Sequence, residues 1–415
     1  MRPLPGASFA FFALILSACG GGGTTIVNPP PPPPTGFKLL LVPHNDDAVV
    51  AAALGWSSGI PTAEVTLTPT DSSAPTRTMT STAAGEANFG DIAAKDYIVE
   101  VRRWLNAAEL ARVPAIEGVD GWAAREKLTV ASGASTQTVA VPASRRRSLV
   151  ISEWAFNTQI IPGVAVYDLG GFLELYNNAD TTVYLDGVVI AEGYNLGNDY
   201  PDFTCASHTA FNDDPLGVWT RFFARFPGTG REHPLQPGHT VVVATDAIDH
   251  SQVILGGLDL SHAEYEFFGF VDVDNPASIN LEDIGIKRRE HGLNFFGLDQ
   301  VVVMSLPLDV PSLVRRPTTT GESEYARIPK DRVLDVMWAR SNYTGNAYPE
   351  CPRVVNAAFD RAGSRARGTD ENLEGEFSLS RKVAITLPGG VKVLQHTRTG
   401  FADFIRTPKT PGVVP

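Results

Sequence analysis

A histidine and two aspartates follow the first apolar run of the chain closely enough to share a metal ion. The stretch LLLVPHNDDAVVAAALG, residues 39–55, places His44, Asp46 and Asp47 within four positions. Imidazole and carboxylate groups are zinc ligands, and a catalytic zinc site keeps three protein ligands and one open position. The chemistry to test against the rest of the chain is therefore zinc-assisted hydrolysis.

This stretch resembles the opening of the LmbE-type zinc deacetylases, where a buried strand ends in His-Pro-Asp-Asp-Glu and the His and second Asp hold zinc. Asn45 stands in place of the proline and Ala48 in place of the glutamate. No later His-x-x-His supplies a third ligand, and Ser57-Ser58-Gly59 leads into alternating strands instead of the βαβ unit that the resemblance implies. We therefore interpret residues 39–47 as a strand that ends in a turn, with no metal.

Two further groups of metal-type side chains lie in the second half of the chain. His233, His239 and His250 surround a strand over Thr240–Ala244, but their spacing is not that of a His-Glu-x-x-His helix, which favours surface-loop histidines. The run DVDNPASINLED lacks the glycine of a calcium loop, which favours a simple turn. Its oxygen donors are Asp272, Asp274, Asn275, Glu282 and Asp283.

Aromatic side chains gather in GVWTRFFARFPGTG. Helical spacing would place Trp219, Phe222, Phe223 and Phe226 on one face, which is most often a core face. The alternative is an aromatic cap over a ligand groove. On that reading the ligand surface comprises Trp219, Phe222, Phe226, His233 and His239.

Short alternating strands follow the opening stretch of residues 39–55. Val65 and Leu67 alternate with polar residues, Pro69 ends that strand, Gly85 marks a turn, and Phe89 points inward. Tyr97-Ile98-Val99-Glu100-Val101 continues the pattern. The order of these pieces resembles the carboxypeptidase-regulatory-like, transthyretin-type sandwich, which we assign to residues 37–144.

A second set of strands follows Arg145-Arg146-Arg147. Ile151-Ser152-Glu153, residues 172–177 (FLELYN), Leu185-Asp186-Gly187 and residues 377–382 (FSLSRK) resemble the lamin-tail domain, an immunoglobulin-type β-sandwich. Its pieces are spread over residues 148–408, with extra material at about 193–236 and 250–330. We predict an all-β chain of two sandwich modules, the second expanded by long insertions.

The whole arrangement resembles a family of uncharacterised bacterial lipoproteins that join a transthyretin-like module to an expanded lamin-tail-like domain. The phrases HPLQPGHTVVVATDAIDH, LDLSHAEYEF, VDNP and RIPKDRVLDVMW have counterparts in that family. This resemblance implies architecture and almost nothing about chemistry, because a fold does not imply a function.

The N-terminus predicts a lipid anchor. Arg2, the apolar run FAFFALIL and Leu16-Ser17-Ala18-Cys19 indicate a signal peptide over residues 1–18 whose cleavage leaves an acylated Cys19. A Gly- and Pro-rich stalk follows over residues 19–36. Gly20 favours the outer membrane. The folded body could face either the periplasm or the outside of the cell.

The net charge argues against one class of partner, and the cysteines leave open whether a disulfide forms. The formal net charge of −12 argues against nucleic acid, whose binding depends on basic surfaces. Cys205 and Cys351 either form a disulfide or are two unrelated thiols, and the oxidising compartment permits a bridge.

We expect a non-catalytic outer-membrane lipoprotein that binds a glycan or a protein, with no cofactor, or that is a scaffold subunit of an uptake complex. The alternative is a metal-assisted hydrolase with its site in the insertions of the second module.

Overall fold

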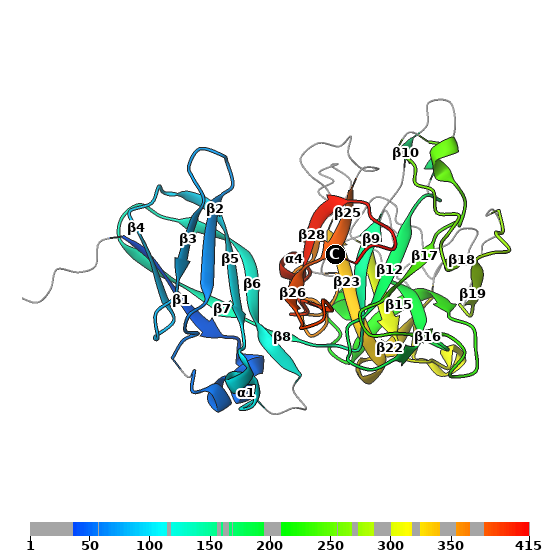
Figure 1. Ribbon diagram of the computed structural model, residues 1–415, viewed down its shortest axis with the longest axis horizontal. Coiled ribbons are helices and arrows are strands. Elements are labelled where there is room, and N and C mark those ends of the chain that lie inside the picture. Colours follow the sequence, from blue (N-terminus) through cyan, green and yellow to red (C-terminus); the bar gives the residue numbers. More distant parts are fainter. Residues whose placement is uncertain are drawn as a thin grey trace, which may run out of the picture. The chain divides into compact units, whose positions relative to one another are not determined.

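The computed structural model describes most of residues 36–415, and its regular structure is almost entirely β-strand, which confirms the predicted all-β class (Figure 1). No helix in the described part of the chain is long and apolar enough to cross a membrane. The acylation candidate Cys19 and both Cys205 and Cys351 lie outside the described residues. The description covers residues 36–414 apart from 57, 114–117, 156–158, 161–165, 168, 195–208, 255, 268–272, 286–299, 318–323, 341–353 and 366–376.

Residues 36–145, which we term the N-terminal module, form two sheets around one apolar core. As predicted, Val65, Leu67, Phe89 and Val99 are buried, and Gly85 turns the chain at a φ of 80°. One sheet has the order β4 (Glu86–Gly90), β1 (Phe37–Pro43), β7 (Ser135–Val141); the other has β3 (Arg77–Thr80), β2 (Glu64–Pro69), β5 (Lys95–Trp104), β6 (Val119–Val130), β8 (Ala143–Arg145).

Residues 146–414, the C-terminal module, are built on one long mixed sheet. The predicted strands at Ile151, Phe172, Thr240 and Phe377 are all present in it. Its order is β24 (Ser364–Arg365), β23 (Val333–Arg340), β20 (Gln300–Ser305), β14 (Val189–Gly193), β15 (Gly217–Arg225), β19 (Ile279–Asp283), β18 (Tyr265–Phe267), β17 (Thr240–Ala244), β12 (Phe172–Asn177), β9 (Leu149–Ala155), β25 (Phe377–Arg381), β28 (Phe404–Pro408). Off this path, β22 (Glu324–Pro329) pairs with β15, and β21 (Arg315–Pro317) pairs with β22.

Short elements complete this fold. The two-stranded pairs are β10 (Gln159–Ile160) with β11 (Val166–Tyr167), β13 (Val183–Tyr184) with β16 (Pro234–Leu235), and β26 (Val383–Thr386) with β27 (Lys392–Leu394). The helices are α1 (Ala48–Leu54), α2 (Ala107–Leu110), α3 (Thr209–Asn212) and α4 (Gly400–Asp403), and the 3₁₀ turns are η1 (Asn45–Asp47), η4 (His250–Gln252), η5 (Val310–Ser312) and η6 (Lys330–Arg332).

The long sheet curls so that its two halves face each other. Ile151 and Leu175 from one half share a buried core with Ile190, Met304 and Met337 from the other. The backbone N–H of Ile151 on β9 also donates a 2.9 Å hydrogen bond to Asp335 on β23. Because the sheet curls, its two end strands, β24 and β28, both contact the short helix α4.

The segment Trp219–Phe226 is a strand and its end, so the helical spacing in its sequence is misleading. β15 spans Gly217–Arg225 and pairs with β14 on one side and with β19 and β22 on the other. Trp219 and Phe223 lie in the core on one face of the sheet, whereas Phe226 lies in the core on the opposite face. These aromatic residues therefore do not form a common surface.

The two predicted insertions are structural parts of the sheet. Residues 193–236 contribute β15, and residues 250–330 contribute β18 to β22. In the described part of the chain this extra material mainly lengthens the sheet, instead of forming loops around a standard sandwich.

Candidate functional site

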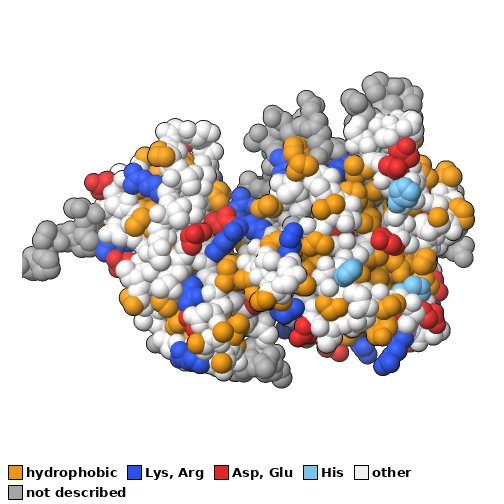
Figure 2. All heavy atoms as spheres, viewed as in Figure 1, with side chains coloured by type: hydrophobic (Ala, Val, Ile, Leu, Met, Phe, Trp, Pro, Cys, Tyr) orange, Lys and Arg blue, Asp and Glu red, His pale blue; other side chains and the backbone are white. Residues whose placement is uncertain are grey.

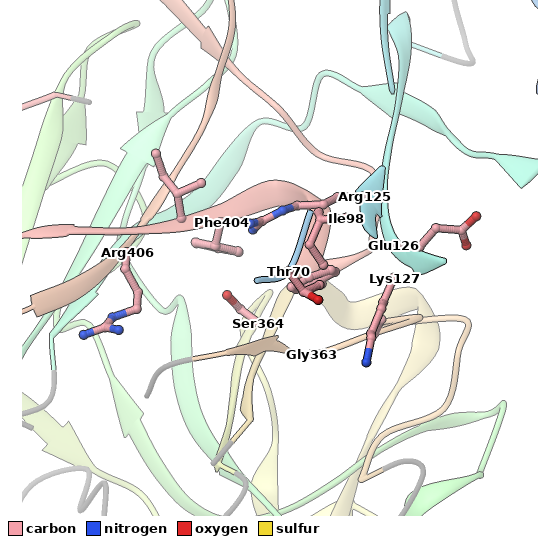
Figure 3. A pocket seen from close by; sticks show the side chains of 12 residues that line it. Thr70, Ile98, Arg125, Glu126, Lys127, Gly363, Ser364, Phe404 and Arg406 are labelled. Carbon is pink, nitrogen blue, oxygen red and sulfur yellow. The ribbon is translucent and has the colours of Figure 1, made fainter. Parts of the chain in front are cut away.

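A cavity of about 860 Å³ lies beside both end strands of the long sheet, and we term it the edge cavity (Figure 3). Phe404, Ile405 and Arg406 come from β28, and Gly363 and Ser364 come from the β24 region. Residues 125–127 of β6, with Thr70 and Ile98, line it from the N-terminal module. Its volume falls in the range of ligand sites, roughly 300–1,000 Å³.

Helix α4 joins the two edges at the base of the cavity. The N–H of Phe401 donates to the Ala362 carbonyl at 2.7 Å, and the N–H of Gly400 donates to Asp360 at 2.9 Å. Asp360 also accepts from the N–H groups of Ala362 and Trp338, and burial raises its pKa to about 7. A Cβ on Gly400 would lie 2.8 Å from the Asp360 carboxylate, so a larger residue here would force that carboxylate to shift.

Three of the four charged side chains that line the edge cavity are cationic. The Cζ atom of Arg125 lies 4.6 Å from the centre of the Phe401 ring, and Arg406 lies 4.5 Å from that of Phe377. The Nε of Arg406 is buried and has no hydrogen-bond acceptor among the described residues. Lys127 forms a 2.7 Å ion pair with Asp96, and Figure 3 shows Glu126 directed away from Arg125. The edge cavity is thus suited to an anionic group.

Ion pairs connect the two modules beside the edge cavity. Lys382, almost fully buried, donates a 2.8 Å bond to Glu100 on β5, and Arg361 bonds Asp46 at 2.8 Å. Figure 2 shows acidic and basic side chains gathered over β5 and β6. The N–H of Arg145 also donates to the His396 carbonyl at 2.9 Å.

A buried charged network fixes β25 to β23. Asp335 accepts hydrogen bonds from Arg381 at 2.6 Å and from the Ile151 N–H at 2.9 Å, and His396 lies 3.2 Å from it. Burial alone would raise the pKa of Asp335, but the Arg381 charge and these donors lower it overall. The network orients the segment that leads through α4 into β28.

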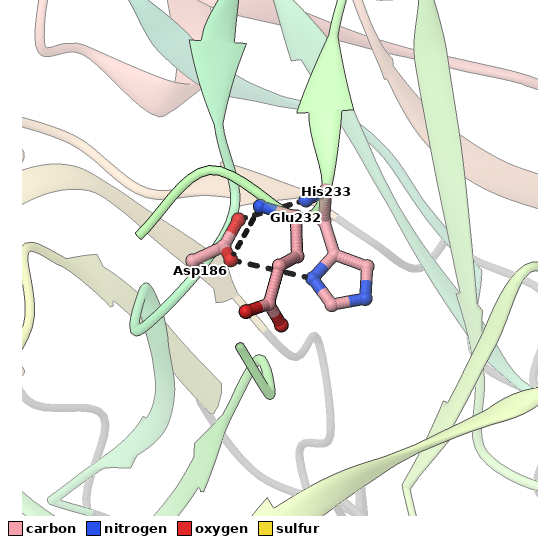
Figure 4. A group of neighbouring side chains, drawn as sticks. All are labelled: Asp186, Glu232 and His233. Atoms are coloured by element: carbon pink, nitrogen blue, oxygen red, sulfur yellow. Dashed lines mark hydrogen bonds and ion pairs between the residues drawn. The ribbon is translucent and has the colours of Figure 1, made fainter. Parts of the chain in front are cut away.

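A second cluster comprises Asp186, Glu232 and His233, whose ligand atoms lie within 4.8 Å of one another (Figure 4). Asp186 accepts backbone N–H bonds from Glu232 at 2.8 Å, His233 at 2.9 Å and Gly230 at 3.2 Å. Burial would raise the pKa of Asp186, but these three donors outweigh it and hold the pKa at about 2. Asp186 therefore anchors the loop before β16.

The three histidines are not brought together, which agrees with the preferred interpretation of separate histidines, although His250 is not on the surface. His233 belongs to the Asp186 cluster, whereas His239 is exposed before β17. His250 is buried, with Nδ1 2.6 Å from the Tyr167 hydroxyl and Nε2 2.8 Å from the Asp246 carbonyl. Trp219, Phe222 and Phe226 belong to β15 and its end, so the five residues proposed as a ligand surface do not share one face.

The opening motif adopts the predicted turn. β1 ends at Pro43, and His44 caps the 3₁₀ turn of Asn45–Asp47. Asp47 is buried against Arg145 at 2.6 Å, and Asp46 bonds Arg361, so both carboxylates have structural partners.

The described residues of the acidic run are held apart by separate partners. Asn275 bonds Glu266, Ala247 and Ser261, while Glu282 pairs with Arg225. Asp274 accepts a bond from Asn280, and Asp283 caps the N–H of Gly285. Asp272 lies outside the described residues.

The residues of the edge cavity were not identified by sequence reasoning. Arg125 and Arg406 occur in ordinary alternating strands, and no motif connects them. The curl of the long sheet, together with the contact between the modules, places them on one cavity.

Comparison with known proteins assigns no function to this chain. Residues 236–410 match the model of a family described as "Protein of unknown function (DUF4876)". A crystal structure of a DUF4876 family protein from Bacteroides thetaiotaomicron VPI-5482 is 18% identical, with a TM-score of 0.49, covering 92% of this chain and 96% of that one. No curated protein matches the chain.

Proposed function

We propose that this chain is a lipid-anchored outer-membrane binding protein, without catalytic activity, whose ligand enters the edge cavity. It would belong among the lipoproteins that its two modules resemble. The observation that carries the proposal is that both end strands of the long sheet line one cavity with Arg125 and Arg406. A few polar groups that converge on a partly apolar cavity are typical of a binding site.

The position of the edge cavity supports binding. It lies next to the ion pairs that join the modules, so a ligand there would contact both modules at once. Cationic and apolar side chains attract and orient a ligand, whereas hydrolysis needs an activated nucleophile or a metal-bound water.

The test is a pull-down from detergent-solubilised outer membranes with the full-length protein and an Arg125→Glu/Arg406→Glu variant. We expect a protein or glycan partner to be recovered with the wild type and lost with the variant. An Arg225→Glu/Arg231→Glu variant, changed on surfaces away from the edge cavity, should still recover it. Equal recovery by all three proteins would contradict the proposal.

The Asp186 cluster favours the alternative, a metal-assisted hydrolase. Its three ligand types fit zinc, and three protein ligands are what a catalytic zinc needs. Against this, three backbone N–H groups already occupy most of the acceptor sites of the Asp186 carboxylate, which leaves it little capacity to bind a metal. Metal analysis of the purified protein decides: stoichiometric zinc that is lost in His233→Ala but kept in His239→Ala would support the hydrolase.

A further inference from the structure

We infer that the ligand of the edge cavity is an extended acidic polypeptide segment that adds to the sheet as a strand beside β28. This inference rests on the proposed function and names its ligand class. β28 pairs only with β25 among the described strands, so its other edge has no strand partner there. Unpaired edges of this kind are templates for an added strand.

The register shows which backbone groups of β28 point away from β25. The Lys382 N–H donates to the Asp403 carbonyl at 2.8 Å, which makes these two residues a hydrogen-bonded pair. Bonded pairs in antiparallel strands recur at every second residue, so Ile405 and Thr407 direct their backbone groups toward β25. The N–H and C=O of Arg406 therefore point the other way.

The two ends of β28 limit the added strand. At the start, the N–H of Phe404 is already bonded to the Gly400 carbonyl within α4. At the end, Pro408 has no N–H to donate. The addition site is thus a short stretch centred on Arg406, which an extended segment of a few residues would cover.

Charge selects an acidic segment. Arg406 lines the edge cavity, and a guanidinium donates charge-assisted hydrogen bonds to a carboxylate. Arg125 lies across the edge cavity on β6, and its neighbour Lys127 is also basic. Glu126 is the acidic side chain of the lining, and burial raises its pKa. A basic segment would meet two arginines at the same site.

The aromatic rings beside the edge cavity favour a peptide over a glycan. Sugars commonly stack on free aromatic faces. Here Arg125 covers one face of Phe401, and Arg406 covers one face of Phe377. The exposed Ile405 offers an apolar side chain that suits an alternating peptide strand.

The test measures binding of a fluorescent peptide of about seven residues, alternating Glu with Thr or Val, to the full-length protein in detergent micelles, by anisotropy; this length covers the five residues of β28. We expect Arg406→Glu to weaken binding about tenfold or more, because it replaces a charge-assisted bond with repulsion. Arg231→Glu, the same charge change at an exposed site, should leave binding within about twofold.

Two further peptides test strand addition itself. N-methyl groups on alternate amides should abolish binding in one register, where they block bonds to β28, and leave binding intact in the other. Equal effects of the two methylation patterns, or equal binding by Arg406→Glu, would overturn the inference. If the peptide fails to bind while the membrane pull-down still depends on Arg125 and Arg406, strand addition is wrong and the proposed function stands.

Discussion

Glu174 shows how a single buried carboxyl group is accommodated in this fold. It lies on β12 opposite Glu153 of β9, beneath the C-terminal residues of the chain. Ser152 donates a hydrogen bond to it at 2.7 Å, and the N–H of Gly412 donates another at 2.8 Å. Burial nevertheless dominates and raises the pKa of Glu174 to about 8.

This pKa predicts a pH-dependent stability. Between the ordinary value of 4.5 and about 8, folded Glu174 keeps a proton that the unfolded chain has released. Stability from this group is therefore complete below about 4.5 and is lost as pH rises to about 8. Glu174→Gln should flatten this fall by up to about 1.4 kcal/mol per pH unit, measured by urea unfolding across that range.

Glu64→Gln is the matched control, because Glu64 is exposed on β2 and its replacement should leave the pH profile unchanged. If Glu174→Gln and wild type lose stability in parallel between pH 5 and 8, Glu174 is ionised in the folded protein and the interpretation is wrong.

β15 explains why one element was misread from sequence. In a strand, residues i and i+4 lie on the same face, as they do in a helix. Because β15 is buried on both faces, Trp219 and Phe223 point to one core while Phe226 follows on the other. Aromatic residues on two faces of a strand thus imitate a helical stripe. Strands with one polar face, such as β2 and β5, kept a clean alternation and were predicted correctly.

The burial of β15 predicts unequal effects of its aromatic residues on stability. Trp219 is buried and its indole N–H donates to Asp214 at 3.0 Å, whereas Phe222 is only half-buried. Trp219→Ala should lower the free energy of unfolding by about 3–5 kcal/mol through loss of packing. Phe222→Ala should lower it clearly less, as measured by urea denaturation. Equal losses would contradict the assignment of Trp219 to the core.

The edge cavity could not be predicted because local sequence patterns do not show which strands pair with each other in the sheet. The strands of Ile151, Phe172 and Phe377 were identifiable from the lamin-tail resemblance. The position of the end strands was not identifiable, since β24 and β28 line one cavity only because the whole sheet curls. The same limit applies to Asp186: the turn at Leu185-Asp186-Gly187 was expected, but its partners Glu232 and His233 follow a long intervening segment.

At the scale of the whole molecule, the predicted anchor would determine in which compartment the protein meets a ligand. Leu16-Ser17-Ala18-Cys19 and the stalk predict a body tethered to the outer membrane through acylated Cys19. Replacing Cys19 with serine removes the acylated thiol, so the protein should be lost from the outer-membrane fraction. Fractionation and immunoblotting measure this. Continued retention in the outer membrane would exclude the lipid anchor.

The contact between the modules is stabilised by the pair of Lys382 and Glu100. Lys382 is 5% exposed and Glu100 is 29% exposed, with 2.8 Å between their charged atoms. Burial lowers the pKa of Lys382 more than Glu100 raises it, so the lysine depends on its partner to stay charged. Arg102 and Arg125 lie close enough to repel it.

Removal of Glu100 should therefore destabilise the protein more than loss of a surface pair. Glu100→Gln leaves a buried cation among other cations, and we expect a loss of about 1–3 kcal/mol, below the full penalty for a broken buried pair because Glu100 is partly solvated. The added change Lys382→Met should restore much of that loss.

Glu282→Gln, which breaks the exposed pair with Arg225, is the control and should change stability by less than about 1 kcal/mol. Urea unfolding of the four proteins distinguishes these outcomes, and a Glu100→Gln loss no larger than that of Glu282→Gln would show that the pair does not hold the modules together.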